Sequence, residues 1–187
     1  MEQPELLQYA IEALERLGIT YMVVGSLASS VYGEPRSTLD IDIVIAPTAV
    51  ELEELCEAFP APDFYVSKEA AREAMRRRSQ FNVLHPTSGN KIDFMIATGD
   101  AWSREQIAGR RRLKLAAGQD YYAARPEDVI LGKLLYFKEG GSEKHLRDVA
   151  AIVKNTGPRI DRGYLDRWVE ELDLMEEWQA ILTRLAQ

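Results

Sequence analysis

The sequence predicts a mixed α/β (α+β) fold that is followed by a bundle of helices at the C-terminal end. Up to about residue 124, segments with the alternation of a strand are interleaved with segments that have helical periodicity. After RPED (125–128) the pattern is helical, and GG at 140–141 and TGP at 156–158 interrupt it. We therefore expect two domains, residues 1–124 and a helical region, residues 125–187, that packs on them.

The elements of the first part are recognised by their periodicity and by the residues at their ends. Gly18 ends the first helix, and Thr48 with Glu51 forms a capping box at the start of a later one. The cluster PTSGN turns the chain between two strands. The expected order is a helix over 6–17, a strand over 19–25, a helix from 26, a strand over 39–46, helices from 48 and over 67–78, strands over 80–85 and 91–97, a helix over 102–112, and a strand or hairpin over 113–124. Three or four helices follow, the first with Pro126 in its first turn.

Composition restricts the environment and the partners. The chain has 187 residues, of which 46% are hydrophobic and 28% are charged, as in ordinary globular proteins. The one cysteine, Cys56, cannot form an internal disulfide and is typical of a reducing compartment. The first residues lack the apolar core of a signal peptide, and no apolar run approaches the roughly 18 residues of a membrane span. We expect a cytoplasmic protein without a membrane partner.

Charge is unevenly distributed along the chain. The net charge of −7 argues against a surface that binds nucleic acid everywhere. Between residues 64 and 125, however, there are 12 Lys and Arg against 6 Asp and Glu, a local charge of +6. This segment is either a set of solvated helix faces or a surface for an anionic partner such as a nucleotide or an RNA backbone.

Two aspartates interrupt an aliphatic strand in LDIDIVIA. Successive side chains of a strand point to opposite faces, so Asp40 and Asp42 share one face while the isoleucines occupy the core face. The same alternation in KIDFMIA puts Asp93 on the face opposite to Phe94. If the two strands are neighbours, three carboxylates gather, and a hard cation such as Mg²⁺ or Mn²⁺ would relieve their repulsion. The alternative is three unrelated aspartates on a solvated face.

A second element precedes these aspartates. VVGS ends a strand and opens a helix, so that backbone N–H groups after Gly25 and the hydroxyl of Ser26 can bind phosphate. Neither Gly-Ser nor Asp-x-Asp is specific alone. Together, and with a third aspartate on a later strand, they predict a phosphate site beside a metal site.

The combination GS…DID…KIDF resembles the nucleotidyltransferase superfamily of the DNA polymerase β type. RSTLDID, from Arg36 to Asp42, is most similar to the bacterial branch of the AbiEii-type toxins and small uncharacterised nucleotidyltransferases, and RPEDVILGKLLYFKEGG and SEKHLRDVAAIV resemble its helical tail. The resemblance implies a nucleotidyltransferase fold over residues 1–124, with a mixed sheet flanked by helices. This chain departs from the pattern of that branch at KHLRD (144–148), where the toxins usually have a Lys-Asp pair.

The resemblance also implies roles for individual residues. The metal-binding and catalytic residues would be Asp40, Asp42 and Asp93. The residues that bind the nucleotide would be Gly25, Ser26, Arg36, Lys133 and Asp148. The cofactor would be Mg²⁺ or Mn²⁺, and an NTP such as ATP would be the substrate.

Lys133 and Asp148 can also be considered without the resemblance. Lys133 has apolar helix neighbours, so its amine either reaches solvent at the edge of the stripe or is directed at a nucleotide phosphate. Asp148 either orients Lys133 or pairs with Lys144, four residues before it. Arg110, Arg111 and Arg112 form either a solvated helix end or a contact for RNA or triphosphate.

The acceptor of the nucleotide stays open at the level of sequence. One candidate is a tRNA, as in AbiEii-like toxins, and a cognate antitoxin would then be a partner. The others are a small hydroxylated molecule, as in antibiotic-modifying enzymes, and a partner protein. A non-catalytic module that binds nucleotides for regulation is the alternative to an enzyme.

Overall fold

The computed structural model describes residues 1–35, 38–115 and 118–185. The chain divides into two compact units. The first contains Met1–Val24 and Ser37–Ala123, and the second contains Gly25–Arg36 and Ala124–Gln187. The second unit thus joins the C-terminal helices with a short segment from the N-terminal half. The division into a catalytic domain, residues 1–124, and a C-terminal helical region, residues 125–187, stays a prediction.

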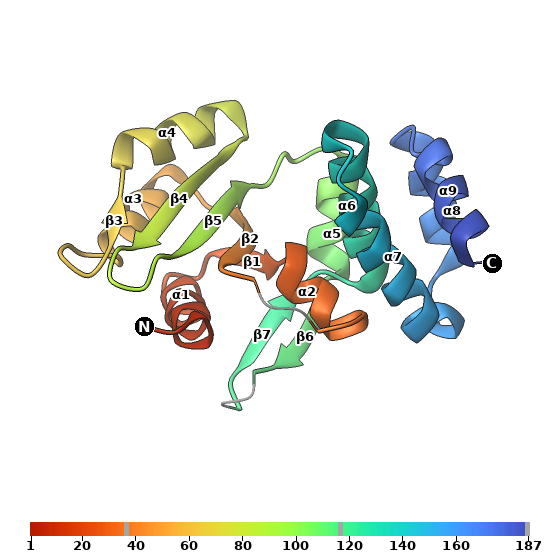
Figure 1. Ribbon diagram of the computed structural model, residues 1–187. Coiled ribbons are helices and arrows are strands. Elements are labelled where there is room, and N and C mark those ends of the chain that lie inside the picture. The colour runs from red at the N-terminus through yellow and green to blue at the C-terminus, as the bar shows by residue number, and fades with distance from the viewer. Residues whose placement is uncertain (36–37, 116–117, 186–187) are drawn as a thin grey trace. The chain divides into compact units, whose positions relative to one another are not determined.

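The first unit is built on a mixed sheet of seven strands in the order β3-β4-β5-β2-β1-β7-β6 (Figure 1). The strands are β1 (Thr20–Val23), β2 (Asp40–Ala46), β3 (Tyr65–Val66), β4 (Gln80–His85), β5 (Asn90–Ile96), β6 (Arg111–Lys114) and β7 (Asp120–Ala123). β2 lies at the centre, antiparallel to β1 and parallel to β5. The predicted fold class, a mixed sheet with helices, is confirmed.

The alternation of β2 produces the core face of the sheet. Ile41, Ile43 and Ile45 are completely buried, whereas Asp40 and Asp42, on the opposite face of the strand, are half-buried. On β5, Phe94 contacts the rings of Phe59 and Phe81 at centroid distances of 6.0 and 5.4 Å. Burial of these aliphatic and aromatic side chains is the main favourable contribution to folding of this unit.

The described part of this unit contains the helices α1 (Gln3–Arg16), α3 (Ala49–Glu57), α4 (Lys68–Arg77) and α5 (Ala101–Gly109). α1 contacts β1 and β5, and α4 contacts β4 and β5. The predicted capping box at α3 is confirmed, because the Glu51 amide donates to Thr48 Oγ1 and the Thr48 amide donates to the Glu51 carboxylate. The helix expected to reach residue 112 ends instead at Gly109. Residues 111–114 pair with β7, so strand pairing replaces the last helical turn.

The second unit is helical in its described part. It contains α2 (Gly25–Tyr32), α6 (Pro126–Gly140), α7 (Glu143–Thr156), a 3₁₀ turn (Gly157–Arg159), α8 (Arg162–Glu171) and α9 (Met175–Leu185). α2 packs against α6 and α7, and α6 also contacts α8 and α9. Gly141, directly after α6, caps this helix in the left-handed conformation typical of helix ends. Within the described ranges, no helix is long and apolar enough to cross a membrane.

Candidate functional site

The three aspartates lie on one face of two adjacent strands. The parallel pairing of β2 and β5 sets Asp42 directly beside Asp93, and Asp40 beside Lys91. Because adjacent strands are about 4.8 Å apart, the Asp42 and Asp93 side chains start as close neighbours on this face. The structure therefore brings together the carboxylates that the sequence could place only on separate strands.

Two further residues engage Asp93. The Lys91 ammonium lies 2.9 Å from Asp93 Oδ2 and 3.5 Å from Asp40 Oδ1. Asn82, in register with Asp93 on β4, donates from Nδ2 to Asp93 Oδ1. Sequence analysis assigned no role to either residue. The position of Lys91 two residues before Asp93, and so on the same face, was a usable signal. The sequence holds no comparable signal for Asn82, because its position opposite Asp93 depends on the register of β4 and β5.

The electrostatic environment differs among these groups. The Asp93 side chain is only 10% exposed, whereas the Asp40 side chain is 50% exposed. The hydrogen bond from Lys91 to Asp93 is the main reason that the pKa of Lys91 is raised above its ordinary value. Lys91 is therefore a cation in contact with two of the three carboxylates.

The chemistry of this donor set fits a hard divalent cation. Asp40, Asp42 and Asp93 offer carboxylate oxygens, which Mg²⁺ and Mn²⁺ prefer. In their present positions, no three His, Cys, Asp or Glu side chains of the described chain are grouped closely enough to hold a metal. Lys91 and Asn82 engage the two oxygens of Asp93, so a metal would require a change at Asp93.

The predicted phosphate-binding residues belong to the second unit. Gly25 starts α2 with φ of +61°, a left-handed conformation that favours glycine over residues with a Cβ. Ser26 follows in the first turn of α2. The amides at the start of a helix are the groups that bind phosphate in other proteins. Arg36, the third predicted residue, lies outside the described residues.

Lys133 and Asp148 form a buried ion pair between α6 and α7. Lys133 Nζ lies 2.6 Å from Asp148 Oδ2, and their side chains are 4% and 12% exposed. Lys133 therefore does not reach solvent at the edge of the apolar stripe. Asp148 pairs with Lys133, the first of the two partners considered. One turn away along the same helices, the rings of Tyr136 and His145 stack at a centroid distance of 5.7 Å.

The three arginines at 110–112 have different environments, because Arg110 lies between α5 and β6 whereas Arg111 and Arg112 are the first residues of β6. Arg111 and Arg112 are exposed on β6, and Arg112 pairs with Asp120 at 2.9 Å. Arg110 instead lies over the Tyr122 ring, 4.5 Å from its centroid, and donates from Nη1 to the Ile107 carbonyl.

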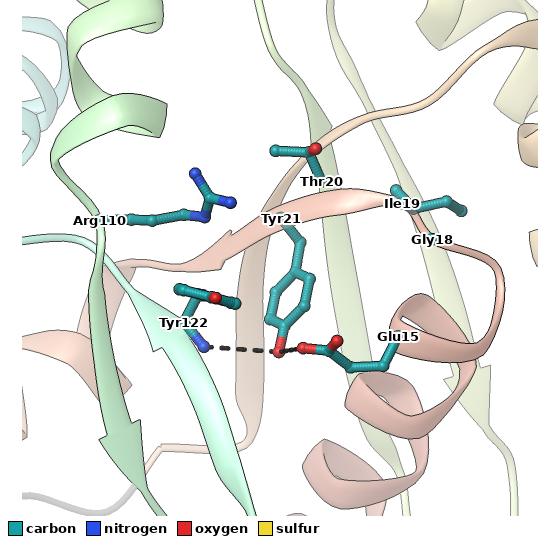
Figure 2. A pocket seen from close by; sticks show the side chains of 7 residues that line it. All are labelled: Glu15, Gly18, Ile19, Thr20, Tyr21, Arg110 and Tyr122. Carbon is teal, nitrogen blue, oxygen red and sulfur yellow. Dashed lines mark hydrogen bonds between the residues drawn. The ribbon is translucent and has the colours of Figure 1, made fainter.

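A pocket of about 160 Å³ lies in the first unit, beside Arg110 (Figure 2). Its walls also include Tyr21, whose hydroxyl donates to Glu15 Oε1 at 2.8 Å, and Thr20. Thr20 pairs with Ala46 at the opposite end of β2 from Asp40, so the pocket is separate from the carboxylates.

Comparisons with known proteins place the fold. No family model matches the chain, and no curated protein matches it in sequence. A crystal structure of ANT(2")-Ia in complex with adenylyl-2"-tobramycin is similar over 94% of this chain and 98% of that chain, with 15% identity and a TM-score of 0.60. An antigenic nucleotidyltransferase-like protein from Paracoccidioides brasiliensis is similar over 96% and 91%, with 17% identity and a TM-score of 0.57. The chain therefore has the nucleotidyltransferase fold.

Proposed function

We propose that this protein is a metal-dependent nucleotidyltransferase that moves a nucleoside monophosphate from an NTP to a hydroxyl acceptor. The observation that carries the proposal is the register of β2 and β5, which sets Asp42 beside Asp93 and on the same face as Asp40. In a chain with the nucleotidyltransferase fold, this is the carboxylate set that the polymerase-β-type signature requires. We also propose that the protein is related to the AbiEii-like branch of the polymerase-β-type nucleotidyltransferases.

Each carboxylate has a proposed role. Asp40 and Asp42 would hold two divalent cations, and Asp93 would complete one of the two sites. Bound there, the cations would supply positive charge at the α-phosphate and at the leaving pyrophosphate. Asp93 would also take the proton of the acceptor hydroxyl. The acceptor oxygen then forms a bond to the α-phosphorus, the bond from that phosphorus to the pyrophosphate oxygen breaks, and pyrophosphate leaves.

The second unit would bind the nucleotide. The proposed residues are Gly25 and Ser26 at the start of α2, Arg36, and the pair of Lys133 and Asp148. Amides at a helix start and a lysine ammonium are both suited to phosphate oxygens. The cofactor would be Mg²⁺ or Mn²⁺, and ATP is one candidate donor.

The first candidate for the acceptor is tRNA, as in AbiEii-like toxins. The feature that favours it is the basic segment between residues 64 and 125, which includes the exposed Arg111, Arg112 and Lys114 of β6. Exposed cations along a strand attract a phosphate backbone in a salt-dependent way. If tRNA is the acceptor, we also propose that the protein has a cognate antitoxin as partner and a cytoplasmic location.

A small hydroxylated molecule is the second candidate. ANT(2")-Ia, which was solved in complex with adenylyl-2"-tobramycin, matches this chain over nearly the whole length of both chains. The similarity in fold and length favours an acceptor of the aminoglycoside type. A partner protein is a further acceptor to be tested.

The test is a labelling experiment. The protein is incubated with each of the four NTPs labelled at the α-phosphate, with Mg²⁺, and separately with total tRNA, tobramycin and a protein extract. We expect incorporation into one pool, and a loss of at least about 100-fold in Asp42→Asn and Asp93→Asn, since even residues that only orient metal ligands cost 10–100-fold. Asp63→Asn, the same change at an exposed aspartate, is the matched control and should keep wild-type incorporation.

Two outcomes would contradict the proposal. The first is wild-type incorporation by Asp42→Asn. The second is an absence of incorporation into all pools with every NTP, together with NTP binding, which would favour the non-catalytic regulatory module.

A further inference from the structure

Lys91 contacts two of the three candidate metal-binding carboxylates, Asp40 and Asp93. It lies two residues before Asp93 on β5 and in register with Asp40 on β2, so its side chain shares their face of the sheet. Its ammonium contacts Asp93 Oδ2 at 2.9 Å and Asp40 Oδ1 at 3.5 Å. The chain thus supplies its own cation to the set of oxygens that is proposed to bind a metal.

In the metal-free protein, the Lys91 ammonium neutralises the charge of a buried carboxylate. Asp93 is 7% exposed and lies beside a second carboxylate, Asp42. A buried carboxylate is costly unless it is paired and hydrogen-bonded, and two adjacent negative charges repel each other. Lys91 supplies the opposite charge, and Asn82 supplies a hydrogen bond to the other oxygen.

The two partners of Asp93 differ in how easily they can leave. Asn82 has a short side chain, and it is held by the pairing of β4 with β5 directly opposite Asp93. Lys91 has a flexible four-carbon stem, and its side chain is already 34% exposed. A cation that ligates Asp93 can therefore displace Lys91 into solvent while the bond from Asn82 stays in place.

We propose that Lys91 is an exchangeable counter-cation, which neutralises Asp93 and Asp40 until a divalent cation displaces it, and that Asn82 is the positioning residue that keeps Asp93 oriented throughout. This inference rests on the proposed function, because it assumes that the metal binds at Asp42 and Asp93. It predicts effects of opposite sign at two residues that contact the same carboxylate.

The experiment measures binding of Mn²⁺ alone, without nucleotide, by the electron paramagnetic resonance of the free ion. Lys91→Met removes the competitor, so the dissociation constant for Mn²⁺ should fall about tenfold or more, as expected from losing a hydrogen bond to a charged group. Lys91→Arg should stay near the wild-type value. Asn82→Ala should raise the constant about 10–100-fold, because Asp93 loses its orientation. Lys154→Met is the control, since it removes an exposed lysine of α7 to which no binding role is assigned, and it should leave Mn²⁺ affinity unchanged.

Thermal unfolding gives a second measurement. Without metal, Lys91→Met should melt below the wild-type protein, because Asp93 is left buried beside Asp42. Saturating Mn²⁺ should raise the melting temperature of Lys91→Met by more than it raises that of the wild-type protein. If Lys91→Met does not fold without metal, Lys91→Gln, which retains a polar side chain, replaces it in both measurements.

The outcomes separate the two proposals. If Asp42→Asn and Asp93→Asn lose Mn²⁺ but Lys91→Met binds it no more tightly than the wild-type protein, the counter-cation role is refuted and the metal site stands. If Asp42→Asn and Asp93→Asn bind Mn²⁺ as tightly as the wild-type protein, the metal site itself is wrong. Absence of binding by both the wild-type protein and Lys91→Met overturns the inference, whereas binding by Lys91→Met alone supports it.

Discussion

The buried pair of Lys133 and Asp148 yields a quantitative prediction for Asp148→Ala. The substitution removes a carboxylate that lies 2.6 Å from an ammonium whose side chain is 4% exposed. Removal of one partner of a buried pair typically costs 3–5 kcal/mol, because a charge stays buried without its counter-charge. Asp148 itself is 12% exposed, so some water reaches the pair, and we expect the lower end of the range. The free energy of unfolding should fall by about 3 kcal/mol, and the melting temperature by about 6–12 °C for a chain of this size.

Replacement of both partners should restore most of this loss. Lys133 lies beside the buried Val129 and Ile130, so a methionine there can fill similar volume without a charge. The double variant Lys133→Met/Asp148→Leu should lie within about 1 kcal/mol of the wild-type protein, since an apolar pair often substitutes for a buried ion pair.

The assay is urea unfolding followed by circular dichroism, with thermal melting as a second measurement. Asp166→Ala, at an exposed aspartate of α8, is the control and should change stability by less than about 0.5 kcal/mol. The reasoning is refuted if Asp148→Ala is as stable as the Asp166→Ala control, or if the double variant is as unstable as Asp148→Ala.

Two further predictions concern the core of the first unit. Ile43→Ala should lower the free energy of unfolding by about 3 kcal/mol, because Ile43 is completely buried on the central strand, whereas Val50→Ala, at a 68% exposed position, should cost less than about 0.5 kcal/mol; urea unfolding measures both. Burial raises the pKa of the Cys56 thiol to about 11, so at pH 8 only about 0.1% is thiolate, against about 24% for an ordinary cysteine. Cys56 should therefore react with a thiol reagent at least about 100-fold more slowly than free cysteine, and in urea the rates should become similar. Fast reaction of the folded protein would contradict the assigned burial.

The elements that follow from local rules were predictable from sequence. The alternation in DIDIVIA predicted both the buried isoleucines and the opposite face of Asp40 and Asp42, because the period of a strand is two residues. Thr48 and Glu51 predicted the start of α3, because a capping box needs only residues three apart. Helical periodicity failed near residue 111, because the hairpin that the sequence indicated over 113–124 begins two residues earlier, at Arg111, where pairing with β7 replaces the helix.

The amino-acid sequence by itself indicated the candidate site residues: three carboxylates on the polar faces of their strands, a glycine at the end of another strand, and a lysine within an apolar stripe. These follow from residue type and period, which are properties of short segments. Only the tertiary structure decided which of these residues meet. The pairing of β2, β5 and β4 set Asp42, Asp93 and Asn82 in one row, and the packing of α7 on α6 set Asp148 against Lys133. Register and helix packing minimise the free energy of the whole core, so residues far apart in the chain become neighbours for reasons that no single segment contains.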